Sequence, residues 1–145
     1  MKKLKIYLAA SMSRRDEMRV VAADLERMGI EITSRWLREE PVSGIQYTKI
    51  IRRRAWAVKD LNDVRKADIL VRFTDDLSRD YVPAKLATGS RMFEMGIAYE
   101  RKMPVVVVGG YQPIFDYLPK IVHVRTLDEL RVYLSGCKFF RQRER

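Results

Sequence analysis

The chain has 145 residues, of which 47% are hydrophobic and 33% charged, and its formal net charge is +10. This length and composition suit one domain over residues 1–145 with a real core, and they exclude disordered, collagenous and membrane-spanning proteins. A single cysteine and a single histidine exclude an internal disulfide and a His/Cys zinc site, so we expect no metal and no cofactor. The sparse cysteine and the short apolar run near the N-terminus indicate a cytoplasmic protein.

Most of the excess positive charge lies near the two ends of the chain, in Lys2, Lys3 and Lys5 and in a basic C-terminal tail that we expect from about residue 138. Terminal basic residues are more typical of solubility or weak attraction to polyanions than of base recognition. We therefore expect neither a specific nucleic-acid site nor a membrane partner.

The first elements follow from hydrophobic periodicity. The apolar, β-favouring run 5–10 predicts a strand. Apolar residues recur at helical spacing from Met18 to Met28 and predict a helix that ends at Gly29. Alternation over 30–36 predicts a second strand, and Pro41 and Gly44 place a loop over 37–44.

The second half continues the alternation of helices and strands. Helical spacing predicts a long helix over 45–67, followed by a strand over 69–73 and a polar loop over 74–88. The remaining predicted elements are helices over 90–102 and 127–134 and strands over 104–108 and 121–124. This order predicts an α/β three-layer sandwich with a five-stranded, mostly parallel sheet. Ligands of such sheets bind beyond the carboxyl ends of the strands, where the loops 10–15, 74–90 and 109–115 meet.

Three residues are candidates for chemistry. Glu94 lies early in an otherwise apolar helix just after Gly89 and Ser90, so it is either a helix-dipole partner or a carboxylate kept at a site. Asp60 shares a helix face with Trp56, although a helical aspartate alone is most often a surface residue. Tyr7 lies in the first strand, where its hydroxyl needs a buried partner if the ring points inward.

The loop after the first strand carries hydroxyl and guanidinium groups, in Ser11, Ser13, Arg14 and Arg15. These groups suit a phosphate that lies against a helix N-terminus, although the loop lacks the glycines of a P-loop. No Ser-His-Asp or Cys-His arrangement is available with one histidine, so carboxylate catalysis is the main enzymatic option.

Taken in chain order, four segments resemble the nucleoside 2-deoxyribosyltransferase family, including its deoxynucleoside 5′-monophosphate N-glycosidase branch: Lys5-Ile-Tyr7-Leu-Ala-Ala, Asp60-Leu-Asn62, Ala67-Asp68-Ile, and Gly89-Ser90 with Phe93-Glu94-Met-Gly96-Ile-Ala98. The resemblance implies a flavodoxin-like fold and cleavage of the N-glycosidic bond of 2′-deoxyribonucleosides or their 5′-monophosphates. It also implies a free nucleobase as second substrate and a homodimer or higher homo-oligomer.

The resemblance assigns roles to the three candidates. Glu94 would attack the anomeric carbon and form a covalent deoxyribosyl-enzyme, Tyr7 would orient its carboxylate, and Asp60 would protonate the leaving base. We expect the helix N-terminus to keep Glu94 ionised and the ring of Trp56 to raise the pKa of Asp60. The remaining candidate substrate-binding residues are Ser11, Arg14, Arg15, Trp56, Asn62, Thr88, Gly89, Ser90 and Arg91.

One position departs from the transferase pattern. Thr88 lies six residues before Glu94, where the transferases carry an aspartate that binds the sugar 5′-hydroxyl. A hydroxyl there suits a 5′-phosphate, although Asp75 or Asp76 could supply the carboxylate instead. The sequence leaves open whether the substrate is a nucleoside or a nucleotide. It also leaves open whether the sugar is transferred to another base or to water. A flavodoxin-like module that binds a nucleotide or polyanion without chemistry is the alternative from another class.

Overall fold

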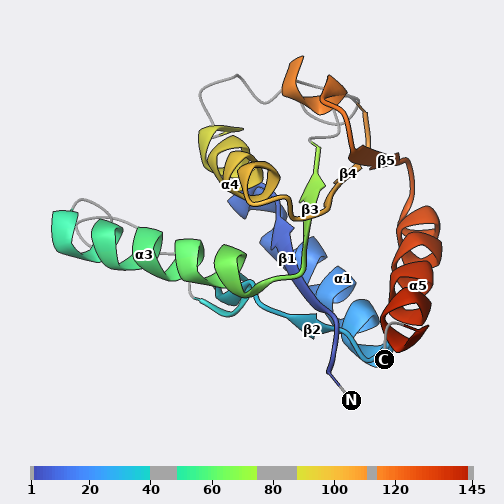
Figure 1. Cartoon of the computed structure of the whole chain (residues 1–145). Helices are drawn as coiled ribbons and strands as arrows, with labels where there is room; N and C mark the ends of the chain where they lie inside the picture. The colour runs from blue at the N-terminus through green and yellow to red at the C-terminus, as the bar shows by residue number, and fades with distance from the viewer. Residues whose placement is uncertain (1, 40–48, 75–87, 111–113, 144–145) are drawn as a thin grey trace.

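A computed structural model describes residues 2–39, 49–74, 88–110 and 114–143, without the side chains of Thr88 and 138–143. Its five strands form one parallel sheet in the order β2-β1-β3-β4-β5 (Figure 1). The strands are β1 (Lys5–Ala9), β2 (Glu31–Ile32), β3 (Ile69–Phe73), β4 (Val105–Val108) and β5 (Ile121–Val124). This strand order is the flavodoxin-like one, which confirms the predicted fold class.

In the described part of the chain, four α-helices cover the sheet, with α1 and α5 on one side and α3 and α4 on the other (Figure 1). They are α1 (Arg15–Arg27), α3 (Ile50–Lys66), α4 (Thr88–Glu100) and α5 (Leu127–Arg143). Three short 3-10 helices, η1 (Met12–Arg14), η2 (Arg35–Arg38) and η3 (Ile114–Tyr117), lie in the connections. None of the described helices is long and apolar enough to cross a membrane.

The core lies between the sheet and these helices. Every residue of β3 and of β4 is buried, because strands covered on both faces need continuous apolar sequence instead of alternation. From α1, the predicted apolar positions Met18, Val21 and Leu25 are buried against the sheet.

The strand predicted over 30–36 is much shorter than expected. Only Glu31 and Ile32 pair with β1, and side chains then replace the strand backbone as hydrogen-bond partners. The Leu8 amide donates to Ser34 Oγ at 2.6 Å, and Trp36 Nε1 donates to the Leu8 carbonyl oxygen at 2.9 Å. The alternation of apolar residues therefore reflected burial of η2 as well as strand geometry.

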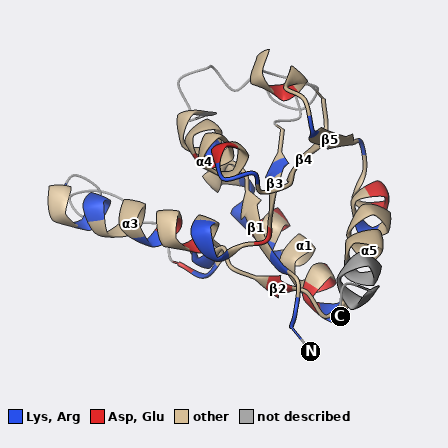
Figure 2. Cartoon of the chain, viewed as in Figure 1, with Lys and Arg blue, Asp and Glu red and all other residues tan. Residues whose placement is uncertain are grey.

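The helix predicted over 90–102 is shifted by two residues, to Thr88–Glu100, and two other helix boundaries differ by more. The last helix runs to Arg143, so most of the expected basic tail is helical, because no proline interrupts the sequence after Leu134. The long helix begins at Ile50, and residues 45–48 lie outside the described part. Basic side chains follow α3 along its length (Figure 2).

Candidate active site

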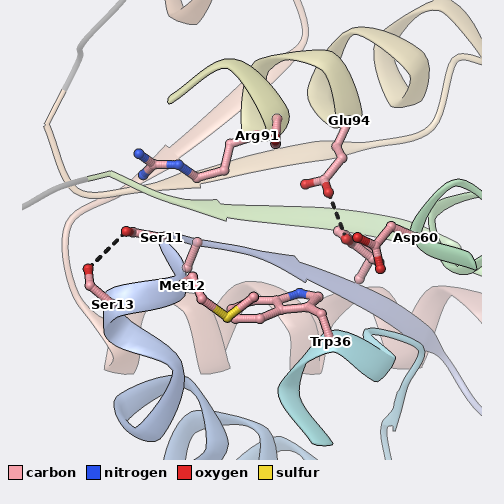
Figure 3. A pocket seen from close by; sticks show the side chains of 10 residues that line it. Ser11, Met12, Ser13, Trp36, Asp60, Arg91 and Glu94 are labelled. Atoms are coloured by element: carbon pink, nitrogen blue, oxygen red, sulfur yellow. Dashed lines mark hydrogen bonds between the residues drawn. The ribbon is translucent and has the colours of Figure 1, made fainter. Parts of the chain in front are cut away.

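A cavity of about 350 Å³ lies beyond the carboxyl end of β1, at the edge of the sheet that the topology predicted. Its walls come from four elements: β1, η2, α3 and α4, together with the loop and η1 that follow β1 (Figure 3). The lining residues are Tyr7, Ala10, Ser11, Met12, Ser13, Trp36, Asp60, Ser90, Arg91 and Glu94. The three residues predicted to carry chemistry therefore share one cavity.

Tyr7 and Glu94 are in direct contact. The Tyr7 hydroxyl donates a hydrogen bond of 2.8 Å to Glu94 Oε1, and the tyrosine ring is fully buried. Tyr7 reaches α4 because β1 is an interior strand beside β3, the strand on which α4 packs. This contact, between residues 87 positions apart in the sequence, is the one predicted for orienting the carboxylate.

Burial raises the pKa of Glu94 to about 7, with a further rise from the neighbouring Asp60. The hydrogen bond from Tyr7 and the positive charge of Arg91 act in the opposite direction and lower this pKa. Desolvation therefore works against the expectation that the helix N-terminus keeps Glu94 ionised. Glu94 lies in the second turn of α4, where the helix dipole has largely faded and desolvation dominates.

Tyr7 is a reliable hydrogen-bond donor at neutral pH. Burial, followed by the nearby carboxylates of Glu94 and Asp60, raises the pKa of its phenol well above the usual value. A phenol that stays protonated donates to a carboxylate and thereby favours its charged form.

Asp60 projects from α3 toward the same space (Figure 3). Its Oδ1 atom is buried and has no hydrogen-bond partner among the described residues. Burial raises the pKa of Asp60, Asp63 adds to the rise, and Lys59 and Arg35 oppose it. A buried carboxyl oxygen without a partner is costly, so Asp60 is suited to holding a proton and giving it to a ligand.

Trp36, not Trp56, is the aromatic wall of the cavity. The Trp36 indole is held by its hydrogen bond to the Leu8 carbonyl oxygen, and Met12 lies beside it (Figure 3). Trp56 does not line the cavity, so the prediction that its ring raises the pKa of Asp60 has no support. The sequence analysis missed Trp36 and Met12. The one signal for Trp36 was its position after the second strand, at the carboxyl end where ligands are expected.

A second space of about 300 Å³ lies between α3 and α4 and is also lined by Asp60, Ser90 and Glu94. Its other walls are mostly apolar: Ala57, Leu61, Val64, Gly89, Phe93 and Ile97. The two carboxyl groups therefore lie where two cavities meet.

The predicted substrate-binding residues divide into two groups. Ser11, Ser90 and Arg91 line the cavity with the carboxylates, and Gly89 lines the adjoining space. The Ser11 and Ser13 hydroxyls are 2.9 Å apart, and the buried Arg91 donates to the Phe73 carbonyl oxygen at 3.3 Å.

The other predicted residues do not reach the cavity. Arg14 donates to the Thr74 carbonyl oxygen at 2.7 Å and pairs with Glu17, and Arg15 donates to the carbonyl oxygen of Glu39. These backbone and helix contacts use the guanidinium groups that we assigned to a phosphate.

Three more predictions concern positions away from the described cavity. Asn62 is exposed on α3 and lines neither space, because it lies two residues beyond Asp60 on another face of the helix. The Thr88 side chain, Asp75 and Asp76 fall outside the described residues. Within the described ranges, no group of three His, Cys, Asp or Glu residues could hold a metal ion.

Comparison with known proteins shows which other proteins share the fold of this chain. No protein-family model matches the chain, and no curated protein matches it. Among solved structures, a 2-deoxyribosyltransferase from the psychrotolerant bacterium Bacillus psychrosaccharolyticus superposes with a TM-score of 0.61 at 20% identity, over 87% of this chain and 89% of that one.

Two further solved structures have a similar fold. A conserved protein from Enterococcus faecalis V583 has a TM-score of 0.60 at 15% identity, over 89% of this chain and 95% of that one. The CMP N-glycosidase of Clostridium botulinum has a TM-score of 0.53 at 13% identity, over 90% of this chain and 98% of that one. The chain therefore has the flavodoxin-like fold that a 2-deoxyribosyltransferase and a CMP N-glycosidase also have.

Proposed function

We propose that the chain cleaves the N-glycosidic bond of 2′-deoxyribonucleosides or their 5′-monophosphates, as a member of the nucleoside 2-deoxyribosyltransferase family. The observation that carries this proposal is the hydrogen bond of 2.8 Å from the buried Tyr7 to Glu94, in a cavity that Asp60 also lines. Solved structures that share the fold include a 2-deoxyribosyltransferase and a CMP N-glycosidase, which supports the same bond as the target.

The chemistry divides between the two carboxyl groups. The Glu94 carboxylate attacks C1′ of the sugar as Asp60 gives its proton to the base, and the electron pair of the C1′–N bond leaves with the base. The product is a deoxyribosyl ester of Glu94 and a free, neutral base. In the second step, a new base or water attacks C1′, loses its proton to Asp60 and restores the Glu94 carboxylate.

The pKa values of Glu94 and Asp60 suit this division of roles. Both carboxyl groups have raised pKa values, and a negative charge on Asp60 raises the pKa of Glu94, so the two groups resist being charged together. Tyr7 and Arg91 lower the pKa of Glu94, and this favours placing the single charge on the nucleophile. The state with ionised Glu94 and neutral Asp60 is the one that the first step needs.

The polar end of the cavity favours a phosphorylated substrate. Ser11, Ser13, Ser90 and Arg91 line it, and hydroxyl and guanidinium groups are donors for a phosphate. Among the described lining residues, the only carboxylates are those assigned to chemistry. We therefore place hydrolysis of a deoxynucleoside 5′-monophosphate beside base transfer as the second candidate activity.

We further propose a homodimer or higher homo-oligomer that covers α3. The amino-terminal part of α3 extends away from the sheet (Figure 1) and exposes Ile50 and Ile51 at 72% and 82%. Phe93 on the neighbouring α4 is also exposed, and it lines the space that reaches Asp60 and Glu94. Exposed apolar side chains that form a contiguous patch are typical of an interface. Sedimentation should show an oligomer that Ile51→Glu dissociates with loss of activity; an active wild-type monomer would contradict the proposal.

The test of the activity is release of free base. The protein is incubated with deoxynucleosides and with their 5′-monophosphates, with and without a second base, and products are separated by chromatography. We expect base release that Glu94→Gln lowers by about 10³-fold or more, and mass spectrometry should find deoxyribose on the peptide that contains Glu94. The matched control is Glu31→Gln, an exposed glutamate of β2 that lines none of the cavities described here. No base release from any substrate, or an active Glu94→Gln variant, would refute the proposal.

A further inference from the structure

A third cavity, which we call the distal cavity, lies at the opposite end of the sheet from the carboxylates. Its volume is about 580 Å³. It is lined by the end of α4, the start of β4, the approach to β5 and one face of α5, through Tyr99, Glu100, Lys102, Met103, Pro104, Val105, Pro119, Lys120 and Tyr133. Val105 is the first residue of β4, so this cavity lies at the amino ends of strands whose carboxyl ends face the candidate active site.

Two lysines of the distal cavity have an unusual backbone conformation. Lys102 and Lys120 have φ angles of 58° and 68°, and they are the only non-glycine residues with positive φ in the described part of the chain. The left-handed conformation costs a residue with a side chain about 1 kcal/mol and favours glycine.

The local hydrogen bonds show why a glycine would suit the first of these positions. The Lys102 amide donates to the Tyr99 carbonyl oxygen and the Met103 amide donates to the Ala98 carbonyl oxygen, each at 2.9 Å. This pattern terminates α4 with a left-handed cap, where glycine is the usual residue. Lys120 occupies the comparable turn between η3 and β5. Cations therefore occupy two turns where the backbone favours a residue without a side chain.

The two lysines take no part in the ion pairs of the described residues. Neither Lys102 nor Lys120 forms an ion pair with a described residue, and Glu100 is the single acidic residue among those that line the cavity. The lining thus carries a net positive charge. An anionic group bound there would gain two charge-assisted contacts without displacing an ion-pair partner among the described residues.

Aromatic rings line the same cavity. Tyr99 comes from α4 and Tyr133 from α5, and both are partly buried. Burial, followed by the neighbouring Cys137, raises the pKa of Tyr133 to about 12, so its phenol is uncharged at neutral pH. Tyrosine rings offer flat apolar faces for a planar ligand, and the hydroxyl offers a polar contact at the edge.

We propose that the distal cavity is a second ligand site, for a molecule that combines a planar aromatic ring with a phosphate, of the size of a nucleoside monophosphate. The lysines contact the phosphate and the tyrosine rings contact the planar ring. The volume of about 580 Å³ exceeds the 350 Å³ of the candidate active site, and it is of the order needed for a drug-sized ligand. The proposal does not depend on the proposed function, because binding here uses none of the carboxylates at the other end of the sheet.

The two sites can be observed separately through methionine methyl groups. Met103 lines the distal cavity and Met12 lines the candidate active site. Adenosine 5′-monophosphate is titrated into Glu94→Gln protein carrying ¹³C-methyl methionine, and the two signals are assigned with Met→Leu variants. We expect the Met103 signal to shift saturably. In the variant with both Lys102→Gly and Lys120→Gly, the affinity read at Met103 should fall at least about tenfold while the Met12 response stays the same.

The double glycine variant is expected to fold, and its unfolding temperature can be compared with that of the parent. Glycine relieves the left-handed backbone at both positions, so the unfolding temperature should stay equal or rise. Lys66→Ala, which removes an exposed lysine of α3, is the control for general loss of charge and should bind as the parent does. The proposal is overturned if the nucleotide leaves the Met103 signal unmoved, if the double glycine variant binds with the parent's affinity, or if adenosine binds as tightly as its monophosphate. Base release by the wild-type protein reports on the proposed function independently.

Discussion

Replacing Tyr7 with phenylalanine removes the hydroxyl that donates to Glu94 at 2.8 Å and leaves the buried ring in place. That hydrogen bond lowers the pKa of Glu94, which burial has raised to about 7. A hydrogen bond to a charged group contributes about 1.5–3 kcal/mol, and one pKa unit corresponds to about 1.4 kcal/mol. The pKa of Glu94 should therefore rise by about one to two units in Tyr7→Phe.

The assay is the pH dependence of kcat/KM for base release, which reports groups of the free enzyme. Glu94 must be ionised to attack, so activity is lost as the pH falls through its pKa. In the parent, this acid limb should lie near pH 7, and in Tyr7→Phe it should move upward by about one to two units. Tyr117→Phe, at a tyrosine that is 69% exposed, is the control. An acid limb that stays in place or moves downward in Tyr7→Phe would refute the reasoning.

Three further predictions address other parts of the site. Asp60→Asn should slow release of natural bases by about 10²–10⁴-fold but should affect a deoxyribosyl p-nitrophenolate leaving group much less; equal losses in a rate comparison would exclude proton donation. Trp36→Ala should raise KM about tenfold or more through lost base stacking with a smaller change in kcat, and Trp36→Phe should restore KM; steady-state kinetics showing loss in kcat alone would contradict this role. Because the folded pKa of Glu94 is raised from 4.5 to about 7, its charge destabilises the folded state at pH 8 but not at pH 4. Glu94→Gln should therefore increase the free energy of unfolding at pH 8 by up to about 3 kcal/mol and leave it nearly unchanged at pH 4, as chemical denaturation would measure; the same change at both pH values would be contrary to this expectation.

Local patterns predicted the elements best where a short run of apolar, β-favouring residues lies between polar turns. The strands over 69–73 and 121–124 have the predicted bounds, because short β-favouring runs between polar turns have few alternatives. The stretch 30–36 was harder, since Ser34 and Trp36 bond to the backbone of β1 through their side chains. Such bonds depend on a neighbouring strand, and local periodicity does not show them.

The candidate site was predictable in part. The alternation of strands and helices placed it beyond the carboxyl ends of the strands, and the resemblance to a family selected Tyr7, Asp60 and Glu94, which line one cavity. The arginines of the first loop were assigned to a phosphate from their residue type alone. In the structure, Arg14 and Arg15 contact the backbone at Thr74 and Glu39, far along the chain from the loop.

The sequence by itself determined the α/β alternation, the end of the sheet at which the candidate active site lies and the types of group available for chemistry, because these depend on periodicity and composition. Only the tertiary structure decided that Tyr7 bonds to Glu94, that burial raises the pKa of Glu94 and that Trp36 is the aromatic wall. Each of these depends on contacts between distant segments and on the exclusion of water around them. The distal cavity has the same origin, since Lys102 and Lys120 line one cavity only when the end of α4 and the start of β5 are brought to one edge of the sheet.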